Sequence, residues 1–575
     1  MANSRSEVPV RPTEARLRRG TVVLADAVDA AVRTEALCVR AMWAPGVSAG
    51  KNAFDEQPKK LGDNLRDAAA AIDACSSVEG RTAAIVSLAS LVDARRKLAS
   101  LVERRCPLVI HALIRLQGDA PSVSAHAELH ALGDLGVAIL YARDAQDAAD
   151  LTVVAHRAAE DAETPVVIVH DGFPSSFARD RVVLPDGPMI RAALEAAPAA
   201  IGPQSNNVAP HRRAAARVPF ALASAMRAFE RYSGRRLHPV EAFGTEGAEI
   251  VLLATGAISE TARATVEHLR TSGNEPHLGV VQVIMVRPFP GADIVRAVGR
   301  ARGVAVIERA DTPLAQSNAM ATEVKAAFAD ALTWAPGYPG IGRIPTIFAS
   351  CIDPNAREAS PGELFAVVEN ALQGEQGRRS LRVGGEGDAV APAAERSVAP
   401  AQSLSLRWSG DPALLLDVIV DLYGGHVRAT PVHPGAGDDV YDITLSHAPV
   451  RTHHGASELD LIVLSGRPEE TEAIGQLREG GVALVSGRDL SSASKSAAQS
   501  RKARVVSIDP GKADARVRTA MLSGAVLRAL PPPGVDRAAL LADVDRAIRS
   551  VVTDDGEARA LIEAVGRAYD SAELS

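Results

Sequence analysis

The stretch from Gly136 to Val169 decides the fold. It begins with Gly136-Val-Ala-Ile-Leu140, continues with apolar residues at helical spacing from Ala145 to Glu163, and ends with Pro165-Val-Val-Ile-Val169. Short β-branched runs on either side of an amphipathic helical segment predict two buried strands joined by a helix. Such a strand–helix–strand unit is typical of a parallel sheet that is covered by helices.

The same pattern continues along the chain in both directions. We expect further strands at residues 108–114, 249–254, 280–286, 303–307, 404–408, 459–464 and 481–485, and a further helix at 260–271. These strands fall into three groups separated by less ordered sequence. The fold class predicted is therefore α/β, with three consecutive parallel-sheet domains.

The domain boundaries follow from changes in composition. Gly374 to Pro400 is rich in Gly, Arg, Glu, Ala and Pro and has no hydrophobic periodicity, so it is the best candidate for a linker. The sequence predicts five segments: a first domain at 1–214, a second domain at 215–373, a linker at 374–402, a third domain at 403–535 and a helical tail at 536–575.

The overall composition excludes several classes of protein. The 575 residues carry a formal net charge of −7, which argues against a general nucleic-acid binder. We find no apolar run long enough to span a membrane and no secretory signal at the start, so we expect a cytoplasmic protein. The four cysteines, Cys38, Cys75, Cys106 and Cys351, are far apart in the sequence. Their spacing predicts reduced thiols and no iron–sulfur cluster on this chain.

Three local motifs fit a known chemistry only in part. Gly46-Val-Ser48-Ala-Gly50 matches the turn that carries a hydrolase serine, but the residues after it, with Pro58, make a poor helix. Gly50-Lys51 lacks the spacing of a phosphate-binding loop. Five histidines at 426, 433, 447, 453 and 454 match no structural zinc pattern, so loop histidines are the favoured interpretation and no metal is predicted.

Three segments near the start of the chain resemble one family. They are Val109-Ile-His111-Ala-Leu-Ile-Arg115, the run Ala145-Gln-Asp-Ala-Ala-Asp-Leu-Thr-Val-Val-Ala-His156, and Asp171-Gly172-Phe173. Their order and separations resemble the pyrimidine-binding domain of the pyruvate:ferredoxin (flavodoxin) oxidoreductases, which belong to the 2-oxoacid:acceptor oxidoreductases.

The resemblance extends over the next two domains. Ile250 to Arg309, with Val286-Arg287-Pro288-Phe289, resembles the transketolase C-terminal-like second domain of the family. Leu404 to about Leu530, with Arg407-Trp408-Ser-Gly410-Asp411, resembles its gamma domain. Each anchor alone is short, but together they are collinear over most of the chain.

The resemblance implies a cofactor, two site residues and a partner. In the family, thiamine diphosphate lies between a pyrimidine-binding and a diphosphate-binding domain, and its carbanion attacks a 2-oxoacid. The motif positions imply that Glu79 contacts the thiamine pyrimidine and that Arg115 binds the substrate carboxylate. Alternatively, Glu79 opens the following helix and Arg115 ends a strand at the surface. The diphosphate-binding domain and the iron–sulfur clusters would belong to a partner chain, so we expect an oligomer.

Several ligand loops depart from the family pattern. Trp43-Ala-Pro-Gly-Val-Ser-Ala lacks a threonine that contacts substrate, Pro174 stands where the family has an arginine, and Gly435-Ala-Gly-Asp-Asp439 replaces two cations of the coenzyme A loop with two acids. Two hypotheses follow. The chain is either a subunit of a pyruvate-like 2-oxoacid:ferredoxin or flavodoxin oxidoreductase that uses coenzyme A, or a catalytically silent structural or regulatory paralogue on the same fold.

Overall fold

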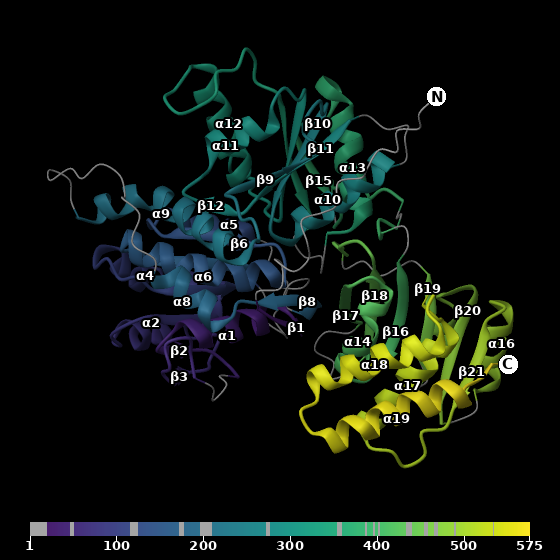
Figure 1. Ribbon diagram of the computed structural model, residues 1–575. Coiled ribbons are helices and arrows are strands. Elements are labelled where there is room, and N and C mark those ends of the chain that lie inside the picture. The colour runs from purple at the N-terminus through teal and green to yellow at the C-terminus, as the bar shows by residue number, and fades with distance from the viewer. Residues whose placement is uncertain are drawn as a thin grey trace, which may run out of the picture.

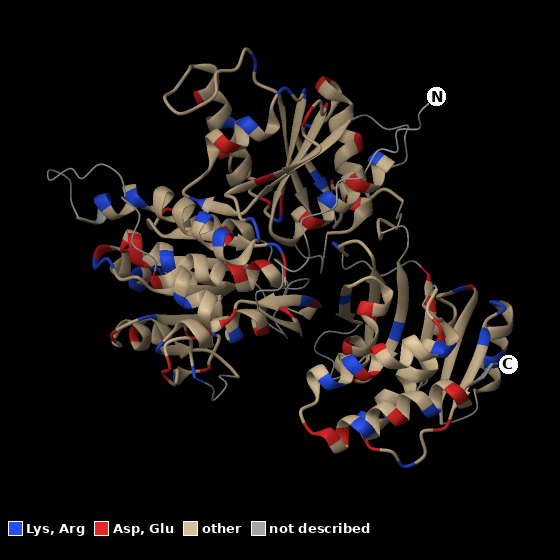
Figure 2. Ribbon diagram, viewed as in Figure 1, with Lys and Arg blue, Asp and Glu red and all other residues tan. Residues whose placement is uncertain are grey.

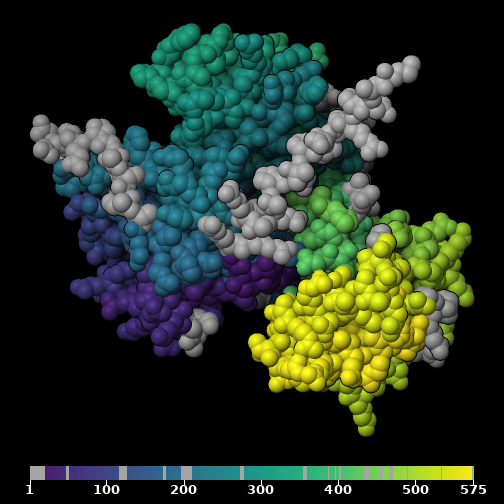
Figure 3. Space-filling view, in the orientation of Figure 1, coloured from purple at the N-terminus to yellow at the C-terminus, as the bar shows by residue number. Residues whose placement is uncertain are grey.

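The computed structural model contains three β-sheets with helices on both faces of each (Figure 1). The first and second units lie one above the other, and the third lies beside them (Figure 3). The structure describes residues 20–46, 51–114, 125–171, 177–195, 210–271, 277–353, 359–385, 388–394, 397–400, 403–432, 440–452, 458–464, 470–487, 490–532 and 534–574.

The first sheet has the strand order β12-β6-β7-β5-β4-β2-β3, and all its pairs are parallel except β12 with β6. Every residue of β4, β5, β6 and β7 is buried, as expected for strands covered on both faces. The strands are β2 (Ala41–Trp43), β3 (Lys59–Gly62), β4 (Thr82–Ser87), β5 (Val109–Leu113), β6 (Ala138–Ala142), β7 (Val166–His170) and β12 (Met285–Arg287).

Two groups of helices enclose the first sheet. One face is covered by α1 (Ala27–Cys38), α6 (Ala145–Ala162), α8 (Gly187–Glu195) and α9 (Pro210–Ser233). The other face is covered by α2 (Ala68–Ser76), α3 (Leu88–Asp93), α4 (Arg95–Glu103) and α5 (Ala125–Gly133). The helix predicted at 145–163 is α6, which is buried along almost its whole length because α1 and α9 both pack on it.

The second sheet has the order β15-β14-β13-β10-β11-β9 and is parallel except for β9. Its strands are β9 (Val240–Phe243), β10 (Ile250–Thr255), β11 (Leu278–Val283), β13 (Gly303–Glu308), β14 (Thr346–Ile352) and β15 (Ser380–Val383). Helices α10 (Gly256–Thr271) and α13 (Pro361–Leu372) cover one face, and α11 (Gly291–Val298) and α12 (Ala319–Leu332) cover the other; a 3-10 turn spans Gly374–Gln376.

The third sheet is mixed, with the order β1-β8-β17-β18-β16-β19-β20-β21-β22. The neighbouring pairs β16–β19, β19–β20 and β20–β21 are parallel, and the remaining pairs are antiparallel. The strands are β1 (Thr21–Ala25), β8 (Arg179–Leu184), β16 (Leu404–Ser409), β17 (His426–Pro431), β18 (Val440–Ser446), β19 (Leu459–Leu464), β20 (Leu477–Ser486), β21 (Arg504–Ile508) and β22 (Glu573–Leu574).

Six helices and a 3-10 turn (Asp421–Tyr423) accompany the third sheet. Its main core is formed by α14 (Ala413–Ile419), α17 (Ala515–Ala529), α18 (Arg537–Val551) and α19 (Asp555–Ser571). Helices α15 (Glu470–Ile474) and α16 (Ser492–Ser500) lie on the opposite face. The helices expected in the tail are present, but they pack into the core of the third unit, and β22 extends its sheet.

The sheets cross the boundaries that the sequence suggested. Strands β1 and β8 come from the N-terminal region yet pair with the third sheet, where Arg428 of β17 binds Asp180 of β8 at 2.6 Å. Strand β12 of the second segment joins the first sheet. The linker predicted at 374–402 contains β15, whose Leu381 and Val383 are buried. A four-residue strand is too short to show a periodicity, so composition alone gave no sign of it.

Charged side chains also join the units. Arg451, which follows β18, binds Glu260 at 2.7 Å and Glu267 at 3.3 Å, both on α10 of the second unit. Burial opposes ionisation of Glu260, but Arg451 and Arg143 lower its pKa to about 2. Elsewhere acidic and basic residues alternate along the helices of all three units (Figure 2). No described helix is both long and apolar enough to cross a membrane.

Candidate functional site at the carboxyl ends of the first sheet

The carboxyl ends of the first and second sheets face each other. Strand β7 ends at His170, and Asp171 follows it. One carboxylate oxygen of Asp171 accepts a hydrogen bond from the backbone N–H of Ala257, at the start of α10, at 2.6 Å. Its other oxygen accepts one from the Tyr141 hydroxyl of β6 at 2.7 Å. Ligands of open α/β sheets usually bind outside the carboxyl ends of the strands, so this junction is the first place to look for a site.

The groups around Asp171 are fully buried. Burial raises the pKa of Asp171, although the hydrogen bonds from Tyr141 and Ala257 oppose the rise. Burial and the neighbouring Asp171 also raise the pKa of Tyr141 well above its ordinary value. His126 lies 3.4 Å from the Tyr141 hydroxyl, and burial lowers its pKa to about 3. It therefore stays neutral at physiological pH and accepts a hydrogen bond from the backbone N–H of Arg309 at 3.3 Å.

The end of β13 is held in a similar way. Glu308 is buried, and its two oxygens accept hydrogen bonds from the backbone N–H groups of Met320 and Ala321 at 3.0 and 3.2 Å. A carboxylate at this position satisfies the free N–H groups at the start of α12. His130 of α5 lies 3.5 Å from the same carboxylate and thereby joins the first unit to the second.

A chain of buried ionisable side chains lies behind this junction. Glu35 of α1 is 2.8 Å from His111 of β5 and 2.7 Å from His156 of α6. The other ring nitrogen of His111 is 2.8 Å from Nε2 of His170. Burial alone would raise the pKa of Glu35, but His156 and His111 hold it below its ordinary value, so Glu35 is a carboxylate.

His170 is the member of this series of buried side chains that lies nearest the carboxyl edge of the sheet. Burial, together with His111 beside it, lowers the pKa of His170 well below 6.5, so its ring is neutral. Its Nδ1 atom is buried and has no hydrogen-bond partner among the described residues. A neutral imidazole with one free nitrogen can accept or donate one hydrogen bond, and the chain to Glu35 fixes its orientation.

The structure places Glu79 at the opposite edge of the sheet. Glu79 is exposed in the turn between α2 and β4, just before β4 begins at Thr82. Strand β4 has six residues, which at about 3.3 Å per residue separates Glu79 from the carboxyl edge by about 20 Å. The thiamine role of Glu79 stays a prediction, and this position argues against it.

Arg115 lies outside the described residues. The residue before it, Ile114, donates a backbone hydrogen bond to the carbonyl of His170 at 3.0 Å, so the chain enters this segment at the carboxyl edge. Ser48, His433, His453 and His454 also lie outside the described residues. Within the described part of the chain, no group of three His, Cys, Asp or Glu side chains could hold a metal ion.

The sequence motifs contained part of this network. His111, His156 and Asp171 all stand in segments that resemble the family, although no role was predicted for them. Glu35 was missed, because its helix was not predicted. The only signal for Glu35 was a carboxylate within an alanine-rich run, and its partners are 76 and 121 residues away.

We tested whether the carboxyl edge can supply the acid that a thiamine pyrimidine needs. Asp63 forms an ion pair with Lys60 at 2.7 Å, and Asp67 and Asp144 cap helices α2 and α6. Asp171 has both oxygens in hydrogen bonds to the protein. Each of these four carboxylates is thus engaged within the protein, so none of the four fits the pyrimidine-binding role.

Comparison with known proteins gives two matches to protein families. Residues 94–230 match the thiamine-diphosphate-binding domain of the pyruvate flavodoxin/ferredoxin oxidoreductases, and residues 248–342 match core domain II of pyruvate:ferredoxin oxidoreductase. The two matched stretches together cover less than half of the chain. The resemblance of the first two units is thereby confirmed.

Individual relatives are distant. The chain is 26% identical over 291 residues to the pyruvate-flavodoxin oxidoreductase of Trichormus variabilis, a match that covers 46% of this chain and 23% of that protein. It is 29% identical over 226 residues to pyruvate synthase subunit PorA of Thermotoga maritima, covering 36% and 57%. The chain thus spans about a quarter of the long relative and about half of the short one.

The similarity of this chain to solved structures is low. A 2-oxoglutarate:ferredoxin oxidoreductase from Magnetococcus marinus is 15% identical with a TM-score of 0.41, covering 62% of this chain and 65% of that chain. The pyruvate oxidoreductase subunit PORC of Thermotoga maritima is 14% identical with a TM-score of 0.23, covering 30% and 99%.

Proposed function

We propose that this chain is a subunit of a thiamine-diphosphate-dependent 2-oxoacid:ferredoxin or flavodoxin oxidoreductase. It would act with a partner chain that carries the diphosphate-binding domain and the iron–sulfur clusters. The observation that carries the proposal is the presence of two family domains in the family's order, at residues 94–230 and 248–342. The hydrogen bond between Asp171 and Ala257 joins these two domains at their carboxyl ends, which supports a common working unit.

The proposal assigns this chain a substrate-holding role. Arg115 follows β5 and would bind the carboxylate of the 2-oxoacid through its planar guanidinium group. Thiamine diphosphate, when bound, would supply the carbanion that attacks the 2-oxo carbon. The motif position also implies a pyrimidine contact for Glu79, although its exposed position at the other edge of the sheet argues against that role.

A second function is favoured by one specific observation. The described carboxylates at the carboxyl edge of the first sheet are occupied by helix caps, an ion pair and the contact with the second unit. These carboxylates serve helix caps and contacts within the protein rather than a ligand. The alternative proposal is therefore a catalytically silent structural or regulatory subunit that docks on the same kind of partner.

One experiment separates the two proposals. The full chain is tagged and purified together with the proposed partner chain, which would carry the diphosphate-binding domain and the iron–sulfur clusters. The complex is then assayed for reduction of a viologen dye that depends on a 2-oxoacid and on coenzyme A. The enzyme proposal predicts turnover that Arg115→Ala reduces by about 100-fold, equivalent to about 2.7 kcal/mol of transition-state stabilisation.

The remaining outcomes decide the other assignments. Unchanged turnover in Glu79→Gln would remove Glu79 from the catalytic site. A stable complex that neither turns over 2-oxoacids nor binds thiamine diphosphate in calorimetry would leave only the silent subunit.

A further inference from the structure

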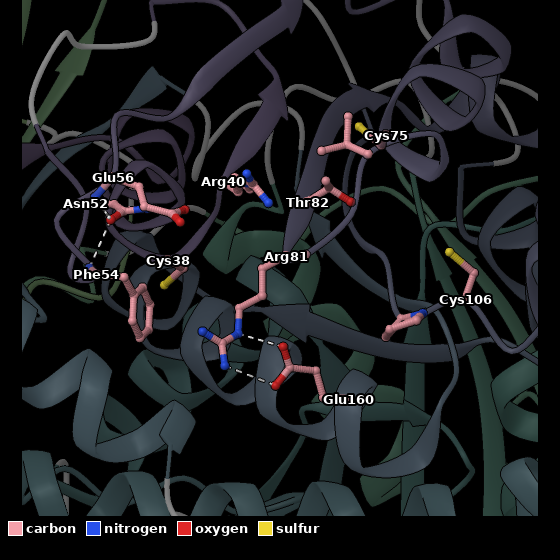
Figure 4. A pocket seen from close by; sticks show the side chains of 13 residues that line it. Cys38, Arg40, Asn52, Phe54, Glu56, Cys75, Arg81, Thr82, Cys106 and Glu160 are labelled. Carbon is pink, nitrogen blue, oxygen red and sulfur yellow. Dashed lines mark hydrogen bonds and ion pairs between the residues drawn. The ribbon is translucent and has the colours of Figure 1, made fainter.

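The first sheet has a cavity at its amino edge, on the side opposite to the junction with the second unit. The cavity has a volume of about 610 Å³, within the range of small-molecule sites. Its walls come from the end of α1, the loop before β3, the end of α2, the starts of β4 and β5, and α6 (Figure 4). Val78 and Gly80, the two neighbours of Glu79, also line it.

Two arginines face this cavity in different electrostatic states. Arg81 is neutralised by Glu160, to which its guanidinium donates two hydrogen bonds at 2.6 and 3.2 Å. The Arg81 guanidinium also stacks on the Phe54 ring at 4.9 Å. Arg40 forms no ion pair with any residue in the described part of the chain, and Figure 4 shows its side chain between Glu56 and Thr82. Arg40 is therefore the cation available to a ligand.

The rest of the wall combines polar side chains with apolar ones and includes three of the four cysteines of the chain. Cys38, Cys75 and Cys106 are free thiols that the fold brings to one cavity from positions far apart in the sequence. Burial raises the pKa of all three, to about 12 for Cys75. At neutral pH they are uncharged and act as a soft, weakly polar surface rather than as nucleophiles or metal ligands.

We propose that this cavity binds a small organic monocarboxylate with an aromatic or branched apolar body. The carboxylate would pair with the Arg40 guanidinium, whose parallel N–H groups match two carboxylate oxygens. The body would lie against Phe54 and the thiols of Cys38 and Cys75. Glu160 is neutralised by Arg81, but Glu56 also lines the cavity and would oppose a second negative charge, so a ligand with a single negative charge fits best.

This site is independent of the proposed oxidoreductase function. It lies about 20 Å along β4 from the carboxyl edge, at the end where Thr82 begins the strand. Gly80, beside the Arg40 stem, has a φ of +96°, and a Cβ atom added there would be in ordinary contact with Arg40 Cδ at 3.6 Å, so backbone conformation rather than space favours glycine at this position. The turn that carries Glu79 is thus part of the rim of this cavity.

The test uses the purified full chain with 4-phenylbutyrate as the probe and 4-phenylbutyramide as the neutral matched control. We expect saturable binding of the carboxylate by calorimetry and at least about tenfold weaker binding of the amide, equivalent to about 1.4 kcal/mol. Arg40→Gln should weaken carboxylate binding to the level of the amide. Arg33→Gln, which removes an exposed arginine of α1 outside the cavity, should leave it unchanged.

The cysteines give a second, independent readout. Slow alkylation by iodoacetamide, followed by peptide mass spectrometry, should show that 4-phenylbutyrate protects Cys106, the most accessible of the three thiols. Cys351 of β14 is buried outside the cavity and reports global opening of the chain. Equal binding of acid and amide, or no saturable binding together with unprotected Cys106, would overturn the proposal, whatever the result of the dye assay.

Discussion

The two edges of the first sheet are occupied in opposite ways. At the carboxyl edge, both oxygens of Asp171 accept hydrogen bonds from protein donors, and the start of α10 of the second unit lies against the end of β7. At the amino edge, a cavity of about 610 Å³ remains, and Arg40 has no ion-pair partner among the described residues. Open α/β sheets usually bind ligands at the carboxyl ends of their strands. In this chain part of that edge packs against another domain, and a cavity large enough for a small molecule lies at the amino edge.

The largest loss of stability should come from mutating the buried network of Glu35, His111 and His156 between the two edges. Glu35→Ala removes the carboxylate that both His111 and His156 contact, and leaves two buried imidazoles without an acceptor. Each buried group left without its partner costs about 1–3 kcal/mol, so the expected loss in the free energy of unfolding is about 2–6 kcal/mol. Urea denaturation of the full chain measures the loss, with hydrogen exchange in β5 locating it.

Glu79→Gln is the matched control, because it alters an exposed carboxylate of the same unit. It should change the free energy of unfolding by less than about 0.5 kcal/mol. Equal losses in the two variants would contradict the view that the buried network of Glu35 and its histidines, and not the exposed turn, stabilises the first unit.

Asp171→Ala should have the next largest effect. It removes the acceptor of two buried hydrogen bonds and with it the contact to the start of α10. We expect a cost of about 2–3 kcal/mol and faster hydrogen exchange at residues 256–262. Tyr141→Phe removes only one of the two bonds and should cost about 1 kcal/mol. Unchanged exchange in α10 would show that Asp171 does not join the two carboxyl edges.

Asp26 gives a prediction about pH dependence. Burial raises the pKa of this helix cap of α1 to about 6, from an ordinary value of 3.8. The folded state therefore binds the proton more tightly than the unfolded state, and the stability that this contributes is lost as the pH rises from about 3.8 to about 6. Asp26→Asn keeps a good cap without the charge and should be more stable than the natural chain by about 1 kcal/mol at pH 7.5.

Thermal unfolding of the natural chain and Asp26→Asn across this pH range is the measurement. The advantage of Asp26→Asn should disappear near about pH 5, and the natural chain should be the more stable of the two below it, because the raised pKa changes their relative stability by about 2 kcal/mol between pH 6 and pH 4. A constant difference at every pH would mean that the carboxyl of Asp26 is not perturbed in the folded chain.

The smallest effect is expected at the amino edge. The ion pair of Arg81 with Glu160 is partly exposed, with 22% and 34% of the two side chains accessible to solvent. Arg81→Gln should therefore cost less than about 1 kcal/mol and speed the alkylation of Cys106. A loss of several kcal/mol in urea denaturation would show that this edge is packed as tightly as the carboxyl edge.

The sequence predicted the strands and helices of the first sheet best where local periodicity was strong. The helix 145–163 and the strands at 108–114 and 165–169 all appear within one or two residues of their predicted bounds. Strand β12 could not be predicted as part of this sheet, because Met285 pairs with Leu140 across about 145 residues of chain. Pairing at such a distance leaves no trace in local composition.

The candidate site was predictable only in part. The motif around Asp171 was visible in the sequence, but its role as a cap for α10 depends on where the second sheet docks. Glu79 was chosen from a short motif, and only the sheet topology showed that it precedes β4 rather than following a strand.

The sequence by itself determined the α/β class, the three groups of strands and the kinship of the first two units, because hydrophobic periodicity and short motifs are local properties. Tertiary structure alone decided that the carboxyl end of β7 in the first sheet contacts the second unit and that a cavity lies at the amino edge of the same sheet. It brought Glu35 to His111 and His156, and three cysteines to one cavity, through contacts between residues tens of positions apart. Such convergence depends on strand order and helix packing, which no single stretch of the chain encodes.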